Sequence, residues 1–246
     1  MKISVITATY NSAQTLEETI NSINSQDYPD IEYIIVDGVS TDSTLEIVHK
    51  YGRRVTTLIS ENDNGIYDAL NKGIALATGD VVGFLHSDDS FADCEVLSRI
   101  AAEFSKESTD AVYGDLNYVS KFDTTKIIRR WISGNYNINK FRNGWMPAHP
   151  TFYMRREQYL SLGGFDLKYS ISSDYESMVR YLWKNNLRAA YIPKVFINMR
   201  VGGESNRSLA NIWKKSKEDV KVMVNSGIPP IRGLLFKNLS KISQFF

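Results

Sequence analysis

The chain has 246 residues, of which 43% are apolar and 23% are charged, a composition typical of globular proteins that bury a core. Its formal net charge of +1, from 29 basic and 28 acidic residues, excludes the broad positive field that suits a nucleic-acid partner. The length predicts one large domain with an appendage.

Three features of the sequence predict a cytoplasmic protein. The single cysteine, Cys94, cannot form an intrachain disulfide, which fits a reducing compartment. Met1 and Lys2 lead directly into an apolar run, with no signal peptide before it. No apolar stretch approaches the roughly 20 residues that a membrane-spanning helix needs.

Predicted strands and helices alternate over residues 1–90. Strands are expected at residues 3–6, 33–36, 55–59 and 81–85, and helices are expected to begin near Thr15, Ser43 and Ile66. Thr15 with Glu18 and Ser43 with Glu46 have the spacing of capping boxes. Such alternation is typical of right-handed βαβ units. We therefore expect an α/β fold whose central sheet is mostly parallel and flanked by helices.

The second half of the chain has a looser pattern and predicts a smaller region. Short strands are expected near residues 111–113, 116–119, 126–131, 151–155 and 195–200, and helices near 94–104 and 209–224. A further helix is expected after a Ser173 cap, with Glu176 completing a capping box. Residues 134–150 lack any periodicity, and a loop of this length inside a compact domain is usually functional.

Acidic residues follow several of the predicted strands. Asp37, Asp63 and the adjacent Asp88 and Asp89 lie just beyond strand ends. Because the carboxyl ends of parallel strands meet at one rim, these acids predict a crevice that binds hydrogen-bond donors, a cation, or both. Asp37 has an alternative role as a turn residue, since Asp-Gly is a common turn pair. Tyr10, after the first strand, is expected to stack on a flat ring or, alternatively, to pack in the core.

The adjacent carboxylates of Asp88 and Asp89 are costly to hold together unless a cation lies between them. Mg²⁺ and Mn²⁺ favour one or two carboxylates together with the phosphate oxygens of a substrate. The alternative is a solvated turn that caps the following helix. The sequence has neither a GxGxxG turn nor a Walker loop, so we expect a carboxylate-bound metal to neutralise any phosphate here.

Four blocks in the first half resemble glycosyltransferase family 2 in order and spacing. They read SVITATYN at 4–11, VDGVSTDST at 36–44, DNGIYDALNKG at 63–73 and FLHSDD at 84–89. The third block is similar to members that build bacterial surface polysaccharides, and the fourth lies where the family has its Asp-x-Asp metal motif. Looser similarity continues at residues 147–150, 163–166, 173–175 and 200–203.

This resemblance implies a GT-A fold, a nucleotide-sugar donor, a divalent cation (Mn²⁺ or Mg²⁺) and inversion at the anomeric carbon. The positions implied to line the donor pocket are Ala8, Tyr10, Asp37, Asp68, Asn71, Lys72, Ser87 and Asp88. Asp88 and Asp89 are implied to hold the metal at the donor diphosphate. Asp174 matches the base that takes the acceptor proton, and the first turn of a helix favours its ionised form. An acid at that position is also an ordinary helix-end residue.

Two departures from the family pattern weaken the expected metal site. His86 stands at the first acid of the Asp-x-Asp motif, and Gly202 stands where many relatives carry a late histidine ligand. Metal dependence is therefore expected to be weaker than usual. Three loop residues are assigned to acceptor or phosphate binding: Trp145, His149 and Arg207. A structural role is the alternative for His149.

The predicted catalytic domain spans residues 1–226 and is followed by a tail at 227–246. Its parts are a nucleotide-sugar-binding half, an acceptor-binding half and a closing helix, at 1–90, 91–207 and 208–226. No acid follows Asp219, whereas four basic residues do: Lys221, Arg232, Lys237 and Lys241. Four apolar tail residues share one helical face: Leu235, Leu239, Ile242 and Phe246. This pattern predicts a helix on an anionic membrane surface. The alternative is packing on its own domain or on a second subunit of a homodimer.

These features together predict an inverting, metal-dependent glycosyltransferase at the inner face of the cytoplasmic membrane. The expected donor is a UDP-sugar, with GDP- and dTDP-sugars as alternatives, and the expected acceptor is a saccharide on polyprenyl diphosphate. The product would belong to a bacterial envelope polysaccharide, such as O-antigen, capsule or exopolysaccharide. The alternative from another class is a catalytically silent module that binds nucleotide sugar or glycan, suggested by His86 and Gly202.

Overall fold

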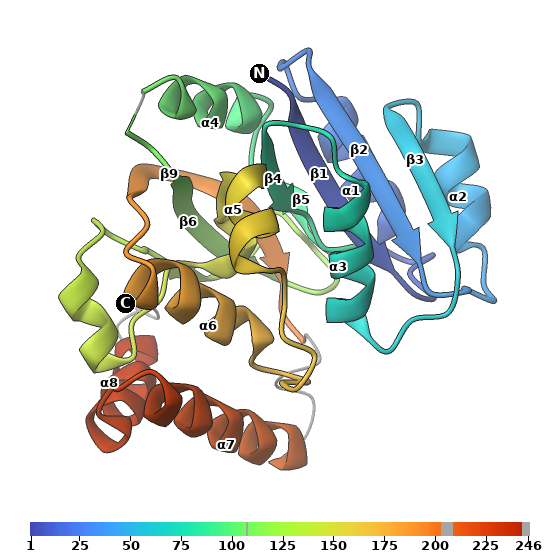
Figure 1. The fold of residues 1–246 in the computed structure, drawn as a ribbon. Helices are drawn as coiled ribbons and strands as arrows, with labels where there is room; N and C mark the ends of the chain where they lie inside the picture. The colour runs from blue at the N-terminus through green and yellow to red at the C-terminus, as the bar shows by residue number, and fades with distance from the viewer. Residues whose placement is uncertain (107, 203–208, 243–246) are drawn as a thin grey trace.

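The computed structural model describes residues 1–106, 108–202 and 209–242 (Figure 1). Its first part has the expected order of elements: β1 (Ile3–Thr9), α1 (Leu16–Asn24), β2 (Ile31–Asp37), α2 (Thr44–Tyr51), β3 (Val55–Ser60), α3 (Ile66–Leu76) and β4 (Val81–Phe84). β1 pairs in parallel with β2 and with β4, and β2 pairs in parallel with β3. The carboxyl ends of these strands therefore share one rim, as predicted.

Beyond β4 the sheet becomes mixed. The remaining strands and longer helices are β5 (Ser90–Phe91), α4 (Val96–Phe104), β6 (Ala111–Val119), β7 (Ile127–Trp131), β8 (Tyr153–Arg155), α5 (Arg156–Leu162), α6 (Ser173–Met178), β9 (Ala189–Arg200), α7 (Leu209–Asn225) and α8 (Pro230–Ile242). The strand order is β3-β2-β1-β4-β8-β6-β9-β5, and β7 pairs with β6. β8 is antiparallel to both neighbours, whereas β6 and β9 are parallel. The rim thus belongs to the parallel part of the sheet.

Several local predictions for the second half are wrong. β6 is one continuous strand where the sequence predicts two. It includes Gly114, where the Phe196 ring occupies the space that a side chain would need. β9 begins at Ala189, earlier than predicted, and α5 is not predicted at all. The stretch expected to be irregular contains two short 3₁₀ helices, Ile138–Asn143 and His149–Thr151.

The predicted capping boxes do not form. Thr15 Oγ1 donates to the carbonyl of Ser87 at 2.8 Å instead of capping α1. Glu18, the partner of Thr15 in the predicted box, pairs with Arg200 of β9. Ser172, not Ser173, occupies the N-cap of α6, and its hydroxyl makes no cap bond. Contacts with neighbouring elements have replaced local caps, which a sequence pattern does not reveal.

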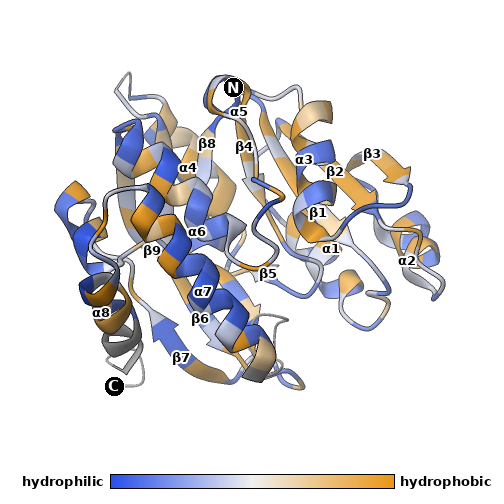
Figure 2. Cartoon of the chain, turned by 60° about the horizontal axis from the view of Figure 1, so that its bottom comes forward, coloured by the Kyte–Doolittle hydropathy of each residue, from blue (hydrophilic) through white to orange (hydrophobic). Residues whose placement is uncertain are grey.

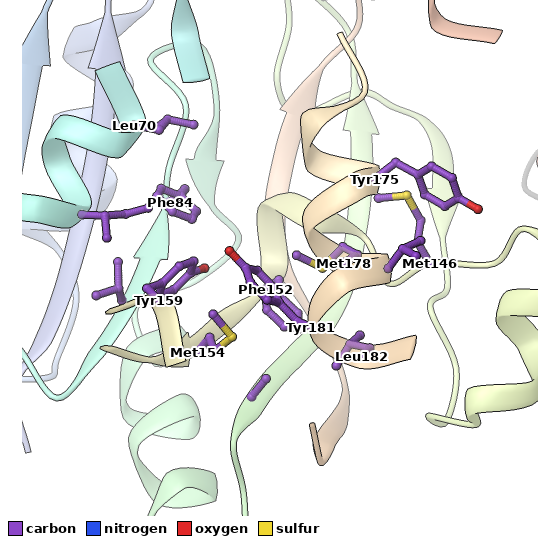
Figure 3. Close-up of a cluster of buried hydrophobic side chains, with 14 of the residues drawn as sticks. Leu70, Phe84, Met146, Phe152, Met154, Tyr159, Tyr175, Met178, Tyr181 and Leu182 are labelled. Carbon is purple, nitrogen blue, oxygen red and sulfur yellow. The ribbon is translucent and has the colours of Figure 1, made fainter. Parts of the chain in front are cut away.

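Alternate residues of the central strands enter two hydrophobic cores, one on each face of the sheet. Val5 and Ile35 belong to the core that includes α1 and α4. Ile6 and Ile34 belong to the core that includes α3, α5 and α6. Figure 3 shows part of this second core, where helices of the second half pack beside α3 and β4. Because both halves share this core, a site built from the two keeps a fixed geometry.

The two C-terminal helices pack on the rest of the domain, α8 against α7 and against the 3₁₀ helix at Ile138–Asn143 (Figures 1 and 2). Arg232 Nε donates to Asn143 Oδ1 at 2.8 Å. Gly144 and Gly233 lie so close that a side chain at residue 144 would overlap the Gly233 carbonyl. The described part of α8 therefore packs on its own domain, the alternative predicted for the tail. None of the helices in the described ranges is both long and apolar enough to cross a bilayer.

Candidate active site

The predicted rim carries an exposed aromatic ring. Tyr10 is 65% exposed, so the alternative of core packing is wrong for this residue. A Cβ at Gly38 would lie 2.6 Å from Asp63 Oδ2 and 3.4 Å from Tyr10 Cδ2, so glycine lets these two side chains approach the backbone of residue 38 closely. Asn11 and Val39, beside these residues, have positive φ angles of 48° and 62°. A positive φ is rare for a β-branched residue such as Val39. Backbone strain of this kind clusters at binding sites.

Asp37 is fully buried at the same rim. Its Oδ2 accepts hydrogen bonds from the Ser40 N–H at 3.0 Å and from Ser60 Oγ at 2.6 Å. Ser40 Oγ in turn accepts the Asn11 N–H at 2.9 Å. Asp37 therefore has the turn role proposed as its alternative, and it joins the loops that follow β1, β2 and β3. Ala8, at the end of β1, is buried as well.

The three donor-pocket candidates on α3 each have a protein partner. Asp68 Oδ2 accepts the Asn64 N–H at 2.9 Å, Asn71 exchanges hydrogen bonds of 2.9 and 2.8 Å with the Phe165 backbone, and Lys72 pairs with Glu61 at 2.8 Å. Through these bonds α3 holds the loops at residues 61–65 and 163–166, which belong to different halves of the chain.

The two adjacent acids after β4 have different surroundings. Asp89 is buried, its Oδ1 accepts the Arg200 N–H at 3.3 Å, and burial together with Asp88 raises its pKa well above the ordinary value. Asp88 is only half-buried. Ser87 Oγ lies 2.9 Å from Ser12 Oγ, which ties this segment to the start of α1. The structure thus places Asp88 toward the rim and Asp89 inside the fold.

The donor set fits a divalent cation held by a single protein carboxylate. The Asp88 carboxylate accepts no hydrogen bond from the residues that the structure describes, so its oxygens are available to a cation. In the same described part of the chain, no three His, Cys, Asp or Glu side chains gather closely enough to form a metal cage. One carboxylate with phosphate oxygens and water suits Mg²⁺ or Mn²⁺. Metal binding would therefore depend on the Asp88 carboxylate and on the phosphate oxygens of a bound substrate.

Asp174, at the start of α6, is the centre of the second part of the site. Its Oδ2 lies 3.1 Å from His149 Nδ1, and its Oδ1 accepts the Tyr175 N–H at 2.8 Å. Tyr67 of α3 places its hydroxyl oxygen 3.4 Å from Asp174 Oδ1 and donates its proton to the Ile171 carbonyl at 2.8 Å. The side chain of Asp174 is 14% exposed. A carboxylate held by α3, α6 and the 3₁₀ helix at His149–Thr151 is well suited to accept a proton.

The protonation states of this pair follow from their surroundings. Burial lowers the pKa of His149 to about 4, so the ring is neutral near pH 7 and its Nδ1–H donates to Asp174. Burial alone would raise the pKa of Asp174, but His149, Lys215, Lys237 and the Tyr175 N–H outweigh it and leave the pKa below its ordinary value. Asp174 is therefore ionised at neutral pH.

His86 connects the metal side of the site with Asp174. Its ring centroid lies 6.0 Å from that of His149, at an interplanar angle of 60°. Burial lowers the pKa of His86, whereas the charges of Asp88 and Asp174 oppose this shift. Its buried Nδ1 has no hydrogen-bond partner among the described residues. The structure thus brings the Asp88 segment and the Asp174 segment into one site.

Sequence reasoning missed three residues of the site: Tyr67, Lys215 and Lys237. Tyr67 is adjacent to Asp68 in the block at residues 63–73, but its role depends on its contact with Asp174 of α6. Lys237 was predicted to face a membrane, and that prediction is wrong because its side chain is 10% exposed and pairs with Asp219 at 2.8 Å. No local signal identifies Lys215 or Lys237, since their positions depend on how α7 and α8 pack.

The remaining loop candidates differ in their placement. Trp145 packs against Phe141 with ring centroids 5.4 Å apart, and its Nε1–H donates to the Ser133 carbonyl at 3.1 Å. It therefore supports the fold of the stretch that contains His149. Gly202 follows β9 with a φ of 106°. Arg207 lies outside the described residues.

Comparison with known proteins agrees with this geometry. The family model described as glycosyl transferase family 2 matches residues 4–166. A PGL/p-HBAD biosynthesis glycosyltransferase of Mycobacterium bovis is 32% identical over 209 residues, covering 82% of this chain and 78% of that protein. An uncharacterized glycosyltransferase of Mycobacterium tuberculosis is 30% identical over 183 residues, covering 72% and 68%.

Solved structures with the same fold include two with bound nucleotides. S. aureus TarS 1–349 in complex with UDP has a TM-score of 0.68 at 22% identity, covering 95% of this chain and 68% of that one. The mannosyltransferase PcManGT from Pyrobaculum calidifontis, in complex with GDP-Man and Mn²⁺, has a TM-score of 0.69 at 21% identity, covering 96% and 68%. At this identity the likeness shows the fold alone, and that fold is the GT-A type expected from the sequence.

Proposed function

Because the chain belongs to glycosyl transferase family 2, we propose that it is an inverting enzyme that moves a sugar from a nucleotide sugar to a hydroxyl of a saccharide acceptor. The observation that carries the proposal is the buried, ionised Asp174, which is held by His149 at 3.1 Å in the same site as Asp88. A carboxylate kept charged in this way can act as a general base.

The reaction is a single displacement. Asp174 takes the proton from the acceptor hydroxyl as its oxygen attacks the anomeric carbon, and the bond from that carbon to the nucleoside diphosphate breaks on the opposite face. The configuration of the sugar therefore inverts. Asp88 would hold a divalent cation, which when bound stabilises the charge of the departing diphosphate. His149 keeps the Asp174 carboxylate oriented throughout the step.

UDP is the nucleotide that we propose for the donor. TarS structures hold UDP and UDP-GlcNAc, which supports this choice, whereas the GDP-Man complex of PcManGT keeps GDP-sugars open, and dTDP-sugars are a further alternative. The exposed ring of Tyr10 beside Asp63 offers a face on which a nucleobase can stack. Asp37, Asp68, Asn71 and Lys72 act by shaping the loops around the nucleotide, given their protein partners.

We place the acceptor at an anionic membrane surface, as a saccharide linked to polyprenyl diphosphate in bacterial envelope polysaccharide assembly. Hydrophobic and hydrophilic residues alternate along α7 (Figure 2). Trp213, Ile231 and Leu235 are exposed on α7 and α8, and a groove of about 260 Å³ between the helices is lined mainly by apolar atoms. The exposed basic residues are Lys214, Lys217, Lys221 and Arg232. The side chains of Leu239, Lys241 and Ile242, and all of Phe246, lie outside the described part.

The acids in the described part of these two helices, Glu218 and Asp219, are paired with other groups of the protein. The outer face of the helices is therefore cationic. The Glu218 carboxylate accepts the N–H groups of residues 170–172 at 2.9–3.2 Å, and Asp219 pairs with Lys237. Such a surface suits anionic lipid. The full chain should co-sediment with phosphatidylglycerol vesicles and not with phosphatidylcholine vesicles. Trp213→Ser with Ile231→Ser should abolish this binding, whereas Phe122→Ser, at an exposed site elsewhere, should not; equal binding by all three proteins would refute the membrane contact.

Turnover tests the enzyme directly. We would measure UDP release from a panel of UDP-sugars with Mn²⁺ or EDTA, for the wild type, Asp88→Asn and Asp174→Asn. Release from one sugar by the wild type alone supports the enzyme. If UDP-sugars are silent, GDP- and dTDP-sugars with a lipid-linked acceptor come next. A protein that binds UDP yet releases none from any donor would be the silent binding module, which His86 in place of an acid continues to favour.

A further inference from the structure

A buried lysine of α8, Lys237, contacts the residue that follows the candidate base Asp174. Lys237 Nζ lies 2.8 Å from Asp219 Oδ2 of α7, and the two side chains are 10% and 5% exposed. The same ammonium lies 3.5 Å from the ring centroid of Tyr175. Tyr175 directly follows Asp174 and donates its N–H to the Asp174 carboxylate at 2.8 Å. α8 therefore reaches the segment that carries the base.

Burying this ammonium has a desolvation cost. Burial lowers the pKa of Lys237 below its ordinary value, and the charge of Asp219 opposes this shift. An exposed lysine would avoid the desolvation, and replacing a buried ion pair by apolar residues is often neutral or stabilising. Stability alone therefore gives no clear reason for a lysine at this position, which lies beside the Asp174 segment.

We propose that Lys237 is a positioning residue for catalysis, through which α8 holds the α6 N-terminus in place and sets a positive charge beside the segment that carries Asp174. This inference rests on the proposed role of Asp174 as the general base. The charged and titratable groups that face Asp174 come from every element around it: His149, His86, Tyr67, Tyr118, Lys215 and Lys237. Lys215 and Lys237 are the cations in this set, and the side chain of Lys237 is 10% exposed.

The test compares charge removal with matched controls in the full chain. Lys237→Gln with Asp219→Asn removes both charges and keeps a polar pair, so it avoids an unpaired buried charge. Lys237→Met with Asp219→Leu is a second, apolar replacement in case the first does not fold. Lys237→Arg keeps the positive charge, and Lys194→Gln removes an exposed lysine of β9.

Two measurements report on the protonation of Asp174. The first is the acid limb of kcat/KM for UDP release from the donor that the wild type uses. The second is the carboxyl ¹³C titration of Asp174, assigned with Asp174→Asn, which needs no turnover. Loss of the Lys237 ammonium raises the pKa of Asp174, whereas loss of the Asp219 carboxylate lowers it. Lys237 is among the groups that shift the pKa of Asp174 and Asp219 is not, so both double variants should still move the limb and the titration upward by about half to one pH unit. Lys237→Arg and Lys194→Gln should leave both near the wild type.

The outcomes separate this inference from the proposed function. A folded double variant with an unchanged limb and titration would overturn the role of Lys237 while leaving Asp174 as the base. Full activity of Asp174→Asn would instead overturn the base, whatever Lys237 does. A purely structural role of Lys237 predicts a lower melting temperature with no shift of either titration.

Discussion

Nδ1 of His149 lies 3.1 Å from Oδ2 of Asp174, and this contact joins a 3₁₀ helix to the first turn of α6. The bond runs from a neutral imidazole to a carboxylate, because burial lowers the pKa of His149 to about 4. With the Tyr175 N–H on the other oxygen, the carboxylate is held in one orientation and stays charged.

Asp174→Asn should remove the proton acceptor while keeping the shape of the side chain. We expect kcat to fall by about 10²- to 10⁴-fold with little change in KM for the donor, since donor contacts stay in place. Steady-state UDP release measures this. Asp30→Asn, at an exposed acid just before β2 and so at the end of the strand opposite to the rim, is the matched control and should behave as the wild type. An equal loss in both variants would speak against a base at position 174.

The pH dependence of kcat/KM should follow the ionisation of Asp174 and not that of a histidine. A carboxyl whose pKa is below its ordinary value of about 3.9 is ionised from about pH 5 upward, so kcat/KM should stay flat to pH 8 as far as this group controls it. His149 has a pKa of about 4 and should add no inflection near pH 6.5. An inflection there that disappears in His149→Asn would contradict a neutral His149.

His149→Leu should weaken the base by removing its hydrogen-bond donor. The pKa of Asp174 then rises, so activity should begin to fall at a higher pH as the solution is acidified, and kcat should drop by about 10- to 100-fold because the carboxylate is less well oriented. His149→Asn can place an amide N–H near the position of Nδ1 and should retain more activity. Equal profiles for the two variants would show that the donor is unimportant.

Asp88 and Asp89 should respond differently to the same change. Asp88→Asn removes the available carboxylate and should abolish the stimulation of UDP release by Mn²⁺. Asp89 is buried with a raised pKa, so Asp89→Asn should keep a metal response close to that of the wild type. A titration with Mn²⁺ after EDTA treatment measures both. Loss of the response in Asp89→Asn, with normal thermal unfolding, would place the metal at Asp89 instead.

Tyr10→Ala should weaken nucleotide binding without destabilising the protein. Its ring is 65% exposed, and stacking of a base on an aromatic ring contributes about 1–3 kcal/mol, so the Kd for UDP should rise by about tenfold. Tyr10→Phe keeps the ring and should bind as the wild type does. Titration calorimetry gives the Kd, and a thermal unfolding curve should show no change in Tm for either variant.

The sequence by itself determined the parallel half of the fold and one side of the site. The apolar runs at β1, β2, β3 and β4 are short and bounded by polar residues, so their strand identity and their common rim follow from local pattern. The prediction that Asp88 and Tyr10 lie at this rim needs only the alternation of strands and helices. Both residues are near the strand ends that position them, which is why local reasoning was sufficient.

Only the tertiary structure decided which groups surround Asp174. His149 belongs to a stretch without periodicity, Tyr67 to the first half, and Lys215 and Lys237 to the two C-terminal helices. The same holds for Asp37 and Asp89, whose acidic side chains are buried by contacts with Ser60 and Arg200. Burial, charge and hydrogen bonding across distant segments set the pKa of a base, and these depend on how the elements pack and not on any local pattern.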